Sequence, residues 1–162
     1  MKTIRRRRKE FKTDYGKRIK LLKSEKPRIV FRKTNRYLIV QYVVSDEAKD
    51  KVVFGLTSKE LLKYSWPKSA IGGLKSLTAS YLTGYLAGKK ILKEKLEQPI
   101  IDLGMIRVLH KTKVYSFIKG LIDAGLKISC KEKVFPEENR IKGEHMKNKT
   151  PFDEIKSKLE KL

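Results

Sequence analysis

The chain has 162 residues and a formal net charge of +22, from 40 Lys and Arg residues against 18 Asp and Glu residues. This length predicts one domain with tails, because domains usually run to roughly 100–200 residues. The apolar fraction of 40% is enough for one modest core. The excess of positive charge predicts a polyanionic partner, so nucleic acid and anionic membrane are the two classes to separate.

No segment of the sequence predicts membrane insertion or export. The longest apolar runs, Ile29–Phe31 and Tyr37–Val44, are far shorter than the roughly 18 residues of a spanning helix. The charged amino terminus is not followed by the apolar core of a signal peptide. The single cysteine, Cys130, cannot form an internal disulfide, and with His110 and His145 it shows no metal-ligand spacing. We therefore expect a cytoplasmic protein with no cofactor, no metal site and no membrane partner.

The positive charge is concentrated at the amino terminus. Residues 1–36 carry 16 Lys and Arg against 3 acidic residues, a net charge of +13, while the other 126 residues carry 24 against 15, or +9. The part before Pro27 is also too poor in apolar residues for a core, so we expect a basic arm over residues 1–26. One interpretation of such a basic run is a solubilising tail or a nuclear-import signal with no further role. However, Phe11 and Tyr15 lie among its cations and offer stacking surfaces beside phosphate-binding groups, which favours nucleic-acid binding.

A β-hairpin is predicted directly after the arm. The segments RIVFRK (28–33) and YLIVQYVV (37–44) are rich in β-branched and aromatic residues, and Asn35 between them tolerates the left-handed backbone of a tight turn. Alternation at period two places one set of side chains on a single face of the second strand: Leu38, Val40, Tyr42 and Val44. The turn carries polar residues that form either a solvated tip or a binding surface: Arg32, Lys33, Thr34, Asn35 and Arg36.

Further along, KVVFGL (51–56) predicts a third strand, and Ser58 is expected to cap a short helix that Pro67 stops. A longer helix is predicted over residues 77–92. Its small-residue face, formed by Ser80, Gly84 and Gly88, implies close packing, because glycine inside a helix costs roughly 1 kcal/mol relative to alanine. A sheet is a commoner neighbour for such a face than an RNA backbone.

The remaining elements complete a mixed fold. Residues 100–108 predict a strand, residues 114–122 a helix that ends at Gly125, and LKISC (126–130) a last strand. The order of elements predicts an α/β (α+β) fold, with a mixed sheet that opens with a hairpin and has helices packed on it. This core domain would span residues 27–135. A basic C-terminal extension would follow over residues 136–162, with a helix after Phe152 that is marginal alone.

No catalytic constellation is visible in the sequence. The two hairpin strands contain no Asp or Glu, which removes the carboxylate anchor of a metal-dependent nuclease. No Ser or Cys nucleophile is paired with a histidine in a recognisable motif, and there is no glycine-rich phosphate loop. Asp102 and Asp123 are more simply explained as groups that satisfy caps or loop amides. We therefore expect a protein that is not an enzyme.

Seven segments, in order, match one family pattern between Arg5 and about Met146: RRRR, KTDYGKRIKLLKSEKPRIVFRKTNRYLIVQ, SKELLKYSW, ASYLTGYLAGKK, DLGM, VYSFIKGLIDAGLKI and FPEENRIKGEHM. Together they resemble the large-subunit ribosomal protein eighteen family in its archaeal and eukaryotic branch. The length is most similar to that of an archaeal member. The stretch Ser69–Ser76 departs from the family pattern, so no contact is assigned there.

The resemblance implies a structural constituent of the large ribosomal subunit that binds 5S ribosomal RNA (5S rRNA) and helps to anchor it in the central protuberance. The implied neighbours are the large-subunit rRNA, large-subunit ribosomal protein five and other proteins of the central protuberance. Carried over by motif, the RNA-binding positions are Arg5, Arg6, Arg7, Arg8, Lys12, Thr13, Asp14, Tyr15, Lys17 and Arg18 in the arm, Arg32, Lys33, Thr34, Asn35 and Arg36 in the hairpin, and Arg140, Lys142, Gly143, Glu144 and His145 near the carboxyl end.

Asp14 is the exception among these positions, because RNA repels a carboxylate. We expect Asp14 to orient neighbouring Arg or Lys side chains, or to accept a hydrogen bond from a base or a 2′-hydroxyl. Two other functions stay open from the residues alone. One is a ribosome-independent RNA chaperone or assembly factor that uses the same charge without a fixed site, and the other is a structural paralogue that has lost RNA binding.

Overall fold

A four-stranded mixed sheet forms the centre of the computed structural model, which describes residues 3–47, 49–146 and 150–162. The strand order is β3-β2-β1-β4; β1 pairs antiparallel with β2 and parallel with β4, and β2 pairs antiparallel with β3. The predicted hairpin and mixed sheet are therefore confirmed. The strands are β1 (Arg28–Lys33), β2 (Leu38–Asp46), β3 (Lys49–Thr57) and β4 (Ile100–Asp102).

The turn between β1 and β2 is closed by Thr34. Its hydroxyl donates to the Tyr37 carbonyl at 2.6 Å and accepts from the Tyr37 N–H at 3.0 Å. Asn35 is not among the residues with positive φ, so the expected left-handed conformation there is wrong. The reason is that a threonine side chain bridges the loop, which removes the need for a strained backbone. Because β1 continues to Lys33, Arg32 and Lys33 belong to the strand and not to the turn.

Strand β2 keeps its alternation, and the bulge beside it lies in β3. The partner of β2 moves from Phe54 to Val52 between Tyr42 and Val43, so Val53 is the extra residue. Leu38, Val40 and Tyr42 are buried in the core cluster as predicted. Val43 is 4% exposed but lies on the opposite face, where it lines a cavity with Val52. Val44 is 41% exposed, so it adds nothing to the core although it shares the period-two face.

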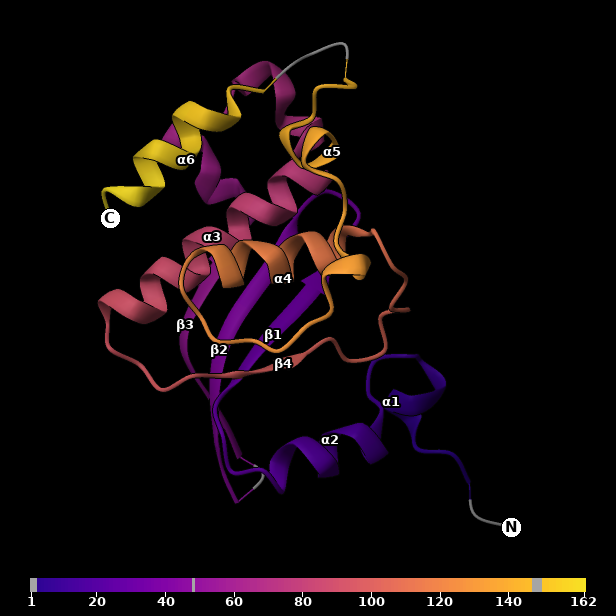
Figure 1. The fold of residues 1–162 in the computed structure, drawn as a ribbon. Coiled ribbons are helices and arrows are strands. Elements are labelled where there is room, and N and C mark those ends of the chain that lie inside the picture. The colour runs from indigo at the N-terminus through magenta and orange to yellow at the C-terminus, as the bar shows by residue number, and fades with distance from the viewer. Residues whose placement is uncertain (1–2, 48, 147–149) are drawn as a thin grey trace.

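Two long helices, α3 (Leu77–Lys93) and α4 (Lys113–Asp123), cover one face of the sheet (Figure 1). Both were predicted from their apolar spacing. The rings of Phe31 in β1 and Phe117 in α4 stack at 4.6 Å between centroids, which joins the helix layer to the sheet. Gly125 ends the α4 segment with a φ of +114, as expected of a helix terminator.

The two helices pack with their backbones in contact. A Cβ on Gly84 of α3 would lie 2.3 Å from the Phe117 carbonyl oxygen of α4, and one on Gly120 of α4 would lie 2.2 Å from the Tyr81 carbonyl oxygen of α3. Gly88 likewise faces Ala124. The small-residue face of α3 therefore meets a helix and not the sheet, which corrects the expected neighbour.

The segment 126–130, expected as a strand, forms no strand in the structure. The Leu126 N–H bonds to the Leu121 carbonyl, and the Ile128 N–H bonds to the Leu126 carbonyl. These amides find partners within the α4 terminus and the segment itself, so the segment does not depend on pairing with the sheet. Cys130 lies in it as a half-buried free thiol.

The fourth strand is shorter than the predicted 100–108. It ends at Asp102 because the chain turns at Gly104, whose φ is +57, and the Asp102 carboxylate accepts the Gly104 N–H at 2.8 Å. A carboxylate that accepts from the backbone two residues later is typical of a turn. Asp102 thus satisfies a loop amide, as expected. Asp123 accepts from the Tyr81 hydroxyl at 2.6 Å.

The short helix after β3 is the 3₁₀-helix η1 (Ser58–Tyr64), and Thr57 is its N-cap. The Glu60 carboxylate accepts from the Thr57 N–H at 3.0 Å, while the Ser58 hydroxyl accepts from the Leu38 N–H of β2 at 3.0 Å. Ser58 is therefore not the cap that its sequence position suggested. A second 3₁₀-helix, η2 (Lys68–Gly73), precedes α3.

The C-terminal residues pack on the same helix layer. Helix α6 buries Phe152, Ile155 and Leu159 in the core cluster and contacts α3 and η1. This packing stabilises a helix that would be marginal alone. Among the described residues, no helix is both long and apolar enough to cross a bilayer. The remaining elements of this region are η3 (Glu132–Val134), α5 (Glu138–Lys142) and α6 (Phe152–Glu160).

Candidate nucleic-acid interface

The arm folds into two short helices, α1 (Arg6–Lys9) and α2 (Tyr15–Leu22), which lie away from the α3–α4 layer (Figure 1). Neither helix contains a buried residue. Their sequence explains this, because the few apolar residues are separated by cations. The arm therefore presents its charged side chains to solvent and to one surface of the sheet.

Asp14 starts α2 as its N-cap. Its carboxylate accepts the N–H groups of Gly16 and Lys17 at 3.1 and 3.3 Å and forms an ion pair with Arg8 at 3.1 Å. The Lys17 amide is the main reason that the pKa of Asp14 lies below its usual range, and Arg8 adds to the effect. The expectation that Asp14 orients a neighbouring cation is confirmed for Arg8. Its capping role was missed, although an aspartate before a helical segment is a known start signal.

Within the arm, most contacts are local. They are Arg6 and Lys12 on Glu10 at 3.0 and 2.6 Å, the Arg7 guanidinium donating to the Thr13 hydroxyl at 3.1 Å, and Arg5 over the Tyr15 ring at 4.8 Å. The Arg6 side chain remains 88% exposed. Exposed pairs of this kind contribute little stability. They leave the guanidinium groups available to phosphates.

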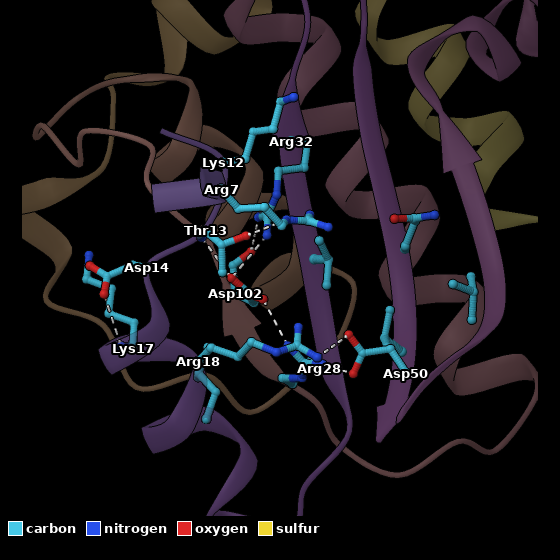
Figure 2. A pocket seen from close by; sticks show the side chains of 16 residues that line it. Arg7, Lys12, Thr13, Asp14, Lys17, Arg18, Arg28, Arg32, Asp50 and Asp102 are labelled. Carbon is cyan, nitrogen blue, oxygen red and sulfur yellow. Dashed lines mark hydrogen bonds and ion pairs between the residues drawn. The ribbon is translucent and has the colours of Figure 1, made fainter. Parts of the chain in front are cut away.

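A cavity of about 270 Å³ lies between the arm and the sheet, and charged side chains from both converge on it (Figure 2). Seven of the predicted RNA-binding residues line it: Arg7, Lys12, Thr13, Asp14, Lys17, Arg18 and Arg32. We call this the arm cavity. The structure thus brings residues of the arm and of β1 into one cation-rich site.

Arg28 lies at the centre of this site and was missed in the sequence. Its side chain is 2% exposed and pairs with Asp102 at 3.1 Å and with Asp50 at 2.7 Å, and it also donates to the Ser45 hydroxyl at 2.8 Å. Its partners are 22 and 74 residues distant in sequence, so no local pattern marks it. A buried arginine needs such partners because an unpaired charge in the interior is costly.

Asp50 connects the arm to the sheet. It binds Arg28 of β1 and also forms a 2.9 Å ion pair with Arg18 of α2 (Figure 2). Partial burial would raise the pKa of Asp50, but the hydrogen bonds from Ser45 and Arg18 and the nearby Arg28 charge outweigh it, so the pKa is lowered. An ionised Asp50 therefore provides one contact that holds α2 against the sheet.

Arg32 is positioned more firmly than a residue of a hairpin tip would be. Its guanidinium donates to the carbonyls of Phe31 and Asp102 at 2.8 and 3.0 Å and lies 3.4 Å from the Asp102 carboxylate. The side chain is still 38% exposed. Arg32 therefore offers solvent a guanidinium in a fixed orientation. At the hairpin end, Lys33, Asn35 and Arg36 are exposed, and Thr34 is half-buried in the turn.

The predicted C-terminal residues lie apart from the arm cavity. Arg140, Lys142, Glu144 and His145 are exposed. Gly143 is buried and ends α5 with a φ of +76, and a Cβ there would lie 2.6 Å from Met146 Cε. Glycine is thus required by the backbone at this position. The predicted site residues therefore do not all converge on one place: seven line the arm cavity, and the residues around α5 do not.

A cation-rich arm beside an α+β core is typical of a protein with a polyanionic partner. The comparisons with known proteins identify its class. A family model described as "Ribosomal large subunit proteins 60S L5, and 50S L18" matches residues 1–98. Similar proteins named "Large ribosomal subunit protein uL18" include those of three archaea described next. The protein of Korarchaeum cryptofilum is 46% identical over 141 residues, covering 87% of this chain and 70% of that protein. Those of Methanosphaera stadtmanae and Methanothermobacter thermautotrophicus are 42% and 40% identical, covering 86% and 87% of this chain and 70% and 71% of theirs.

The chain belongs to this family of large-subunit ribosomal proteins. The resemblance to the protein eighteen family is thereby confirmed, and the similar proteins come from archaea, as the length suggested. Members of the family are structural constituents of the ribosome and not enzymes, so ribosomal RNA and the ribosome are its partners.

Proposed function

We propose that this chain binds 5S rRNA through its arm and hairpin and helps to anchor that RNA in the central protuberance, next to large-subunit ribosomal protein five. The observation that carries the proposal is the arm cavity, where α1, α2, the turn between them and β1 bring seven predicted binding residues together. Affinity would come from the arginines and lysines on phosphates. Residues 1–26 act here as a binding arm on a folded core.

Selectivity requires groups whose positions are defined before binding. Arg32 donates to the Phe31 carbonyl of β1 and to the Asp102 carbonyl of β4. The Thr34 turn holds Asn35 and Arg36 at the exposed end of a paired hairpin. Folded RNA is recognised through phosphates, sugar hydroxyls and unstacked bases, which such fixed polar tips can address. We assign attraction mainly to the arm and positioning mainly to the hairpin.

A footprint on isolated 5S rRNA tests the proposal. We expect strong protection of one region, which survives a large excess of unrelated RNA. An RNA chaperone would protect many sites weakly, and a paralogue without RNA binding would protect none; either outcome contradicts the proposal.

The salt dependence of binding tests the mechanism separately. With roughly six to ten phosphate contacts, log K against log salt should have a slope of about −4 to −9. A slope near −1 would rule out attraction by the arm.

A competition between 5S rRNA and bulk RNA at one fixed salt concentration tests the hairpin. The double variant Asn35→Ala with Arg36→Ala should lose more of its preference for 5S rRNA than of its affinity for bulk RNA.

A further inference from the structure

A second cavity, of about 530 Å³, lies where the end of β1 meets the loop before α4 and the start of α5. Its cations come from four separate segments: Lys33, Arg107, Lys111, Lys113 and Arg140. We call it the loop cavity. Only Lys33 and Arg140 of this group were expected to face RNA.

The positive charge of the loop cavity is largely uncompensated. Lys111 pairs with Glu137 at 3.2 Å, whereas the other four cations have no carboxylate within ion-pair distance in the part of the chain that the structure describes. No Asp or Glu is among the lining residues described. Burial, together with the charges of Lys33 and Lys75, lowers the pKa of Lys113. Four cations around one cavity form a site for an anion.

The floor of the loop cavity is apolar. Ile106, Leu109 and Val114 line it together with Phe31, and Leu109 remains 48% exposed. An apolar surface beside cations suits a nucleotide, whose base is planar and weakly polar on its faces and whose phosphate is charged. An unstacked base therefore fits better than a bare phosphate, which would leave the floor uncovered.

The loop cavity and the arm cavity lie on opposite faces of the sheet, because Arg32 lines the arm cavity and the next residue of β1, Lys33, lines the loop cavity. The loop after the edge strand β4 connects them. Arg8 of the arm contacts Met105 sulfur at 3.6 Å in this loop, and the next residue, Ile106, lines the loop cavity. A nucleic-acid strand bound by the arm would reach the loop cavity by passing around this edge of the sheet. This continuity favours RNA over an acidic peptide as the occupant.

We propose that the loop cavity holds one unstacked nucleotide of the bound RNA, with the base on the Ile106–Leu109 floor and the phosphate on Lys33, Lys113 and Arg140. This inference rests on the proposed function, because the arm is what delivers the RNA. It adds Arg107, Lys113 and the apolar floor to the residues that recognise RNA.

The test compares charge-matched variants of the full chain on two probes, a single-stranded oligoribonucleotide of about eight nucleotides and a duplex of equal charge. We expect Lys113→Gln with Arg140→Gln to weaken binding of the single strand by about tenfold and to change duplex binding much less, since a paired base cannot enter the cavity. The control is Lys93→Gln with Lys161→Gln, which removes the same charge from exposed positions far along α3 and α6. Circular dichroism and thermal unfolding establish that all variants are folded.

The proposal would be overturned if the cavity variant and the control lost the same affinity, or if the cavity variant lost the same affinity for both probes. Either result would show that only the total charge matters.

Leu109→Ala tests the apolar floor of the cavity. It should weaken binding of the single strand by about fivefold and leave duplex binding unchanged. Protection of Lys113 from an amine-reactive ester should be stronger with the oligoribonucleotide than with a polyglutamate peptide. The reverse order would assign the cavity to an acidic protein and overturn the proposal.

The two proposals fail in different ways. If the proposed function is wrong, variants of the arm leave 5S rRNA affinity unchanged. If only the loop cavity inference is wrong, the arm variants still weaken 5S rRNA binding while Lys113→Gln with Arg140→Gln behaves as the charge-matched control.

Discussion

Helices α2 and α3 show two different ways in which this chain forms a helix. Helix α2 has no buried residue and is held by the Asp14 cap and by the ion pair between Arg18 and Asp50. Helix α3 is buried over most of its length and packs its glycines directly on the backbone of α4. The comparison teaches that the arm is stabilised by hydrogen bonds and charge, which water and salt weaken, whereas the core depends on packing.

The largest expected effect concerns the arm and RNA. Replacing Arg5, Arg6, Arg7 and Arg8 by Gln should weaken 5S rRNA binding by about a hundredfold at low salt and reduce the magnitude of the salt slope by about 3 to 4, because up to four phosphate contacts are lost. Thermal unfolding should change little, since these side chains bury nothing. The measurement is a binding titration at several salt concentrations. An unchanged slope would show that these arginines do not contact phosphates.

The next effect belongs to the core. Phe117→Ala and Leu121→Ala should each lower the free energy of unfolding by roughly 2–5 kcal/mol, because both side chains are fully buried and would leave cavities. Denaturant unfolding of the free protein measures this. RNA affinity of the folded variants should stay close to that of the parent protein. A large change in salt slope would contradict the separation of core and arm.

The close contact between α3 and α4 can be tested by adding a methyl group to a glycine at that contact. Gly120→Ala should lower the free energy of unfolding by about 1–3 kcal/mol, because its Cβ would lie 2.2 Å from the Tyr81 carbonyl oxygen and force the helices apart. Gly72→Ala is the control, since nothing lies within 4 Å of a Cβ there. If both variants were equally stable, α3 and α4 would not be packed as closely as the structure has them.

The smallest effect is expected where the arm meets the sheet. The lowered pKa of Asp50 means that ionised Asp50 favours the native state above about pH 4, and that this contribution is lost as the pH falls through the lowered value. Arg18→Gln should release α2 from Asp50, with a loss of less than about 1 kcal/mol. Asp50→Asn would cost more, because it also takes a carboxylate from the buried Arg28. Limited proteolysis at several pH values reports release of the arm. Unchanged cleavage in Arg18→Gln would mean that other contacts hold α2.

Several elements could be predicted because their signals are local. The β-branched runs around Thr34 predicted the hairpin, and the spacing of Val114, Phe117 and Leu121 predicted α4. The predicted strand over 126–130 failed because an apolar run indicates burial and not the pairing partner. Alternation placed Val44 on the face of Leu38, Val40 and Tyr42, but it did not show that this end of β2 is 41% exposed at Val44.

The candidate site divides in the same way. The basic arm, the exposed hairpin residues and Arg140 could be identified by charge and by resemblance. Arg28 could not, because its partners Asp50 and Asp102 reach it only through strand pairing. The loop cavity also depends on assembly, since Lys33, Arg107 and Arg140 are far apart along the chain.

By itself, the sequence determined the charge of the arm, the presence of the hairpin and of helices α3 and α4, and the family to which the chain belongs. These follow from side-chain type and periodicity, which act over a few residues. The tertiary structure alone decided that glycines of α3 meet α4, that Arg28 is buried between two aspartates, and that five cations line one cavity with an apolar floor. Those features arise from contacts between segments distant in sequence, where the neighbour and not the residue sets packing and electrostatics.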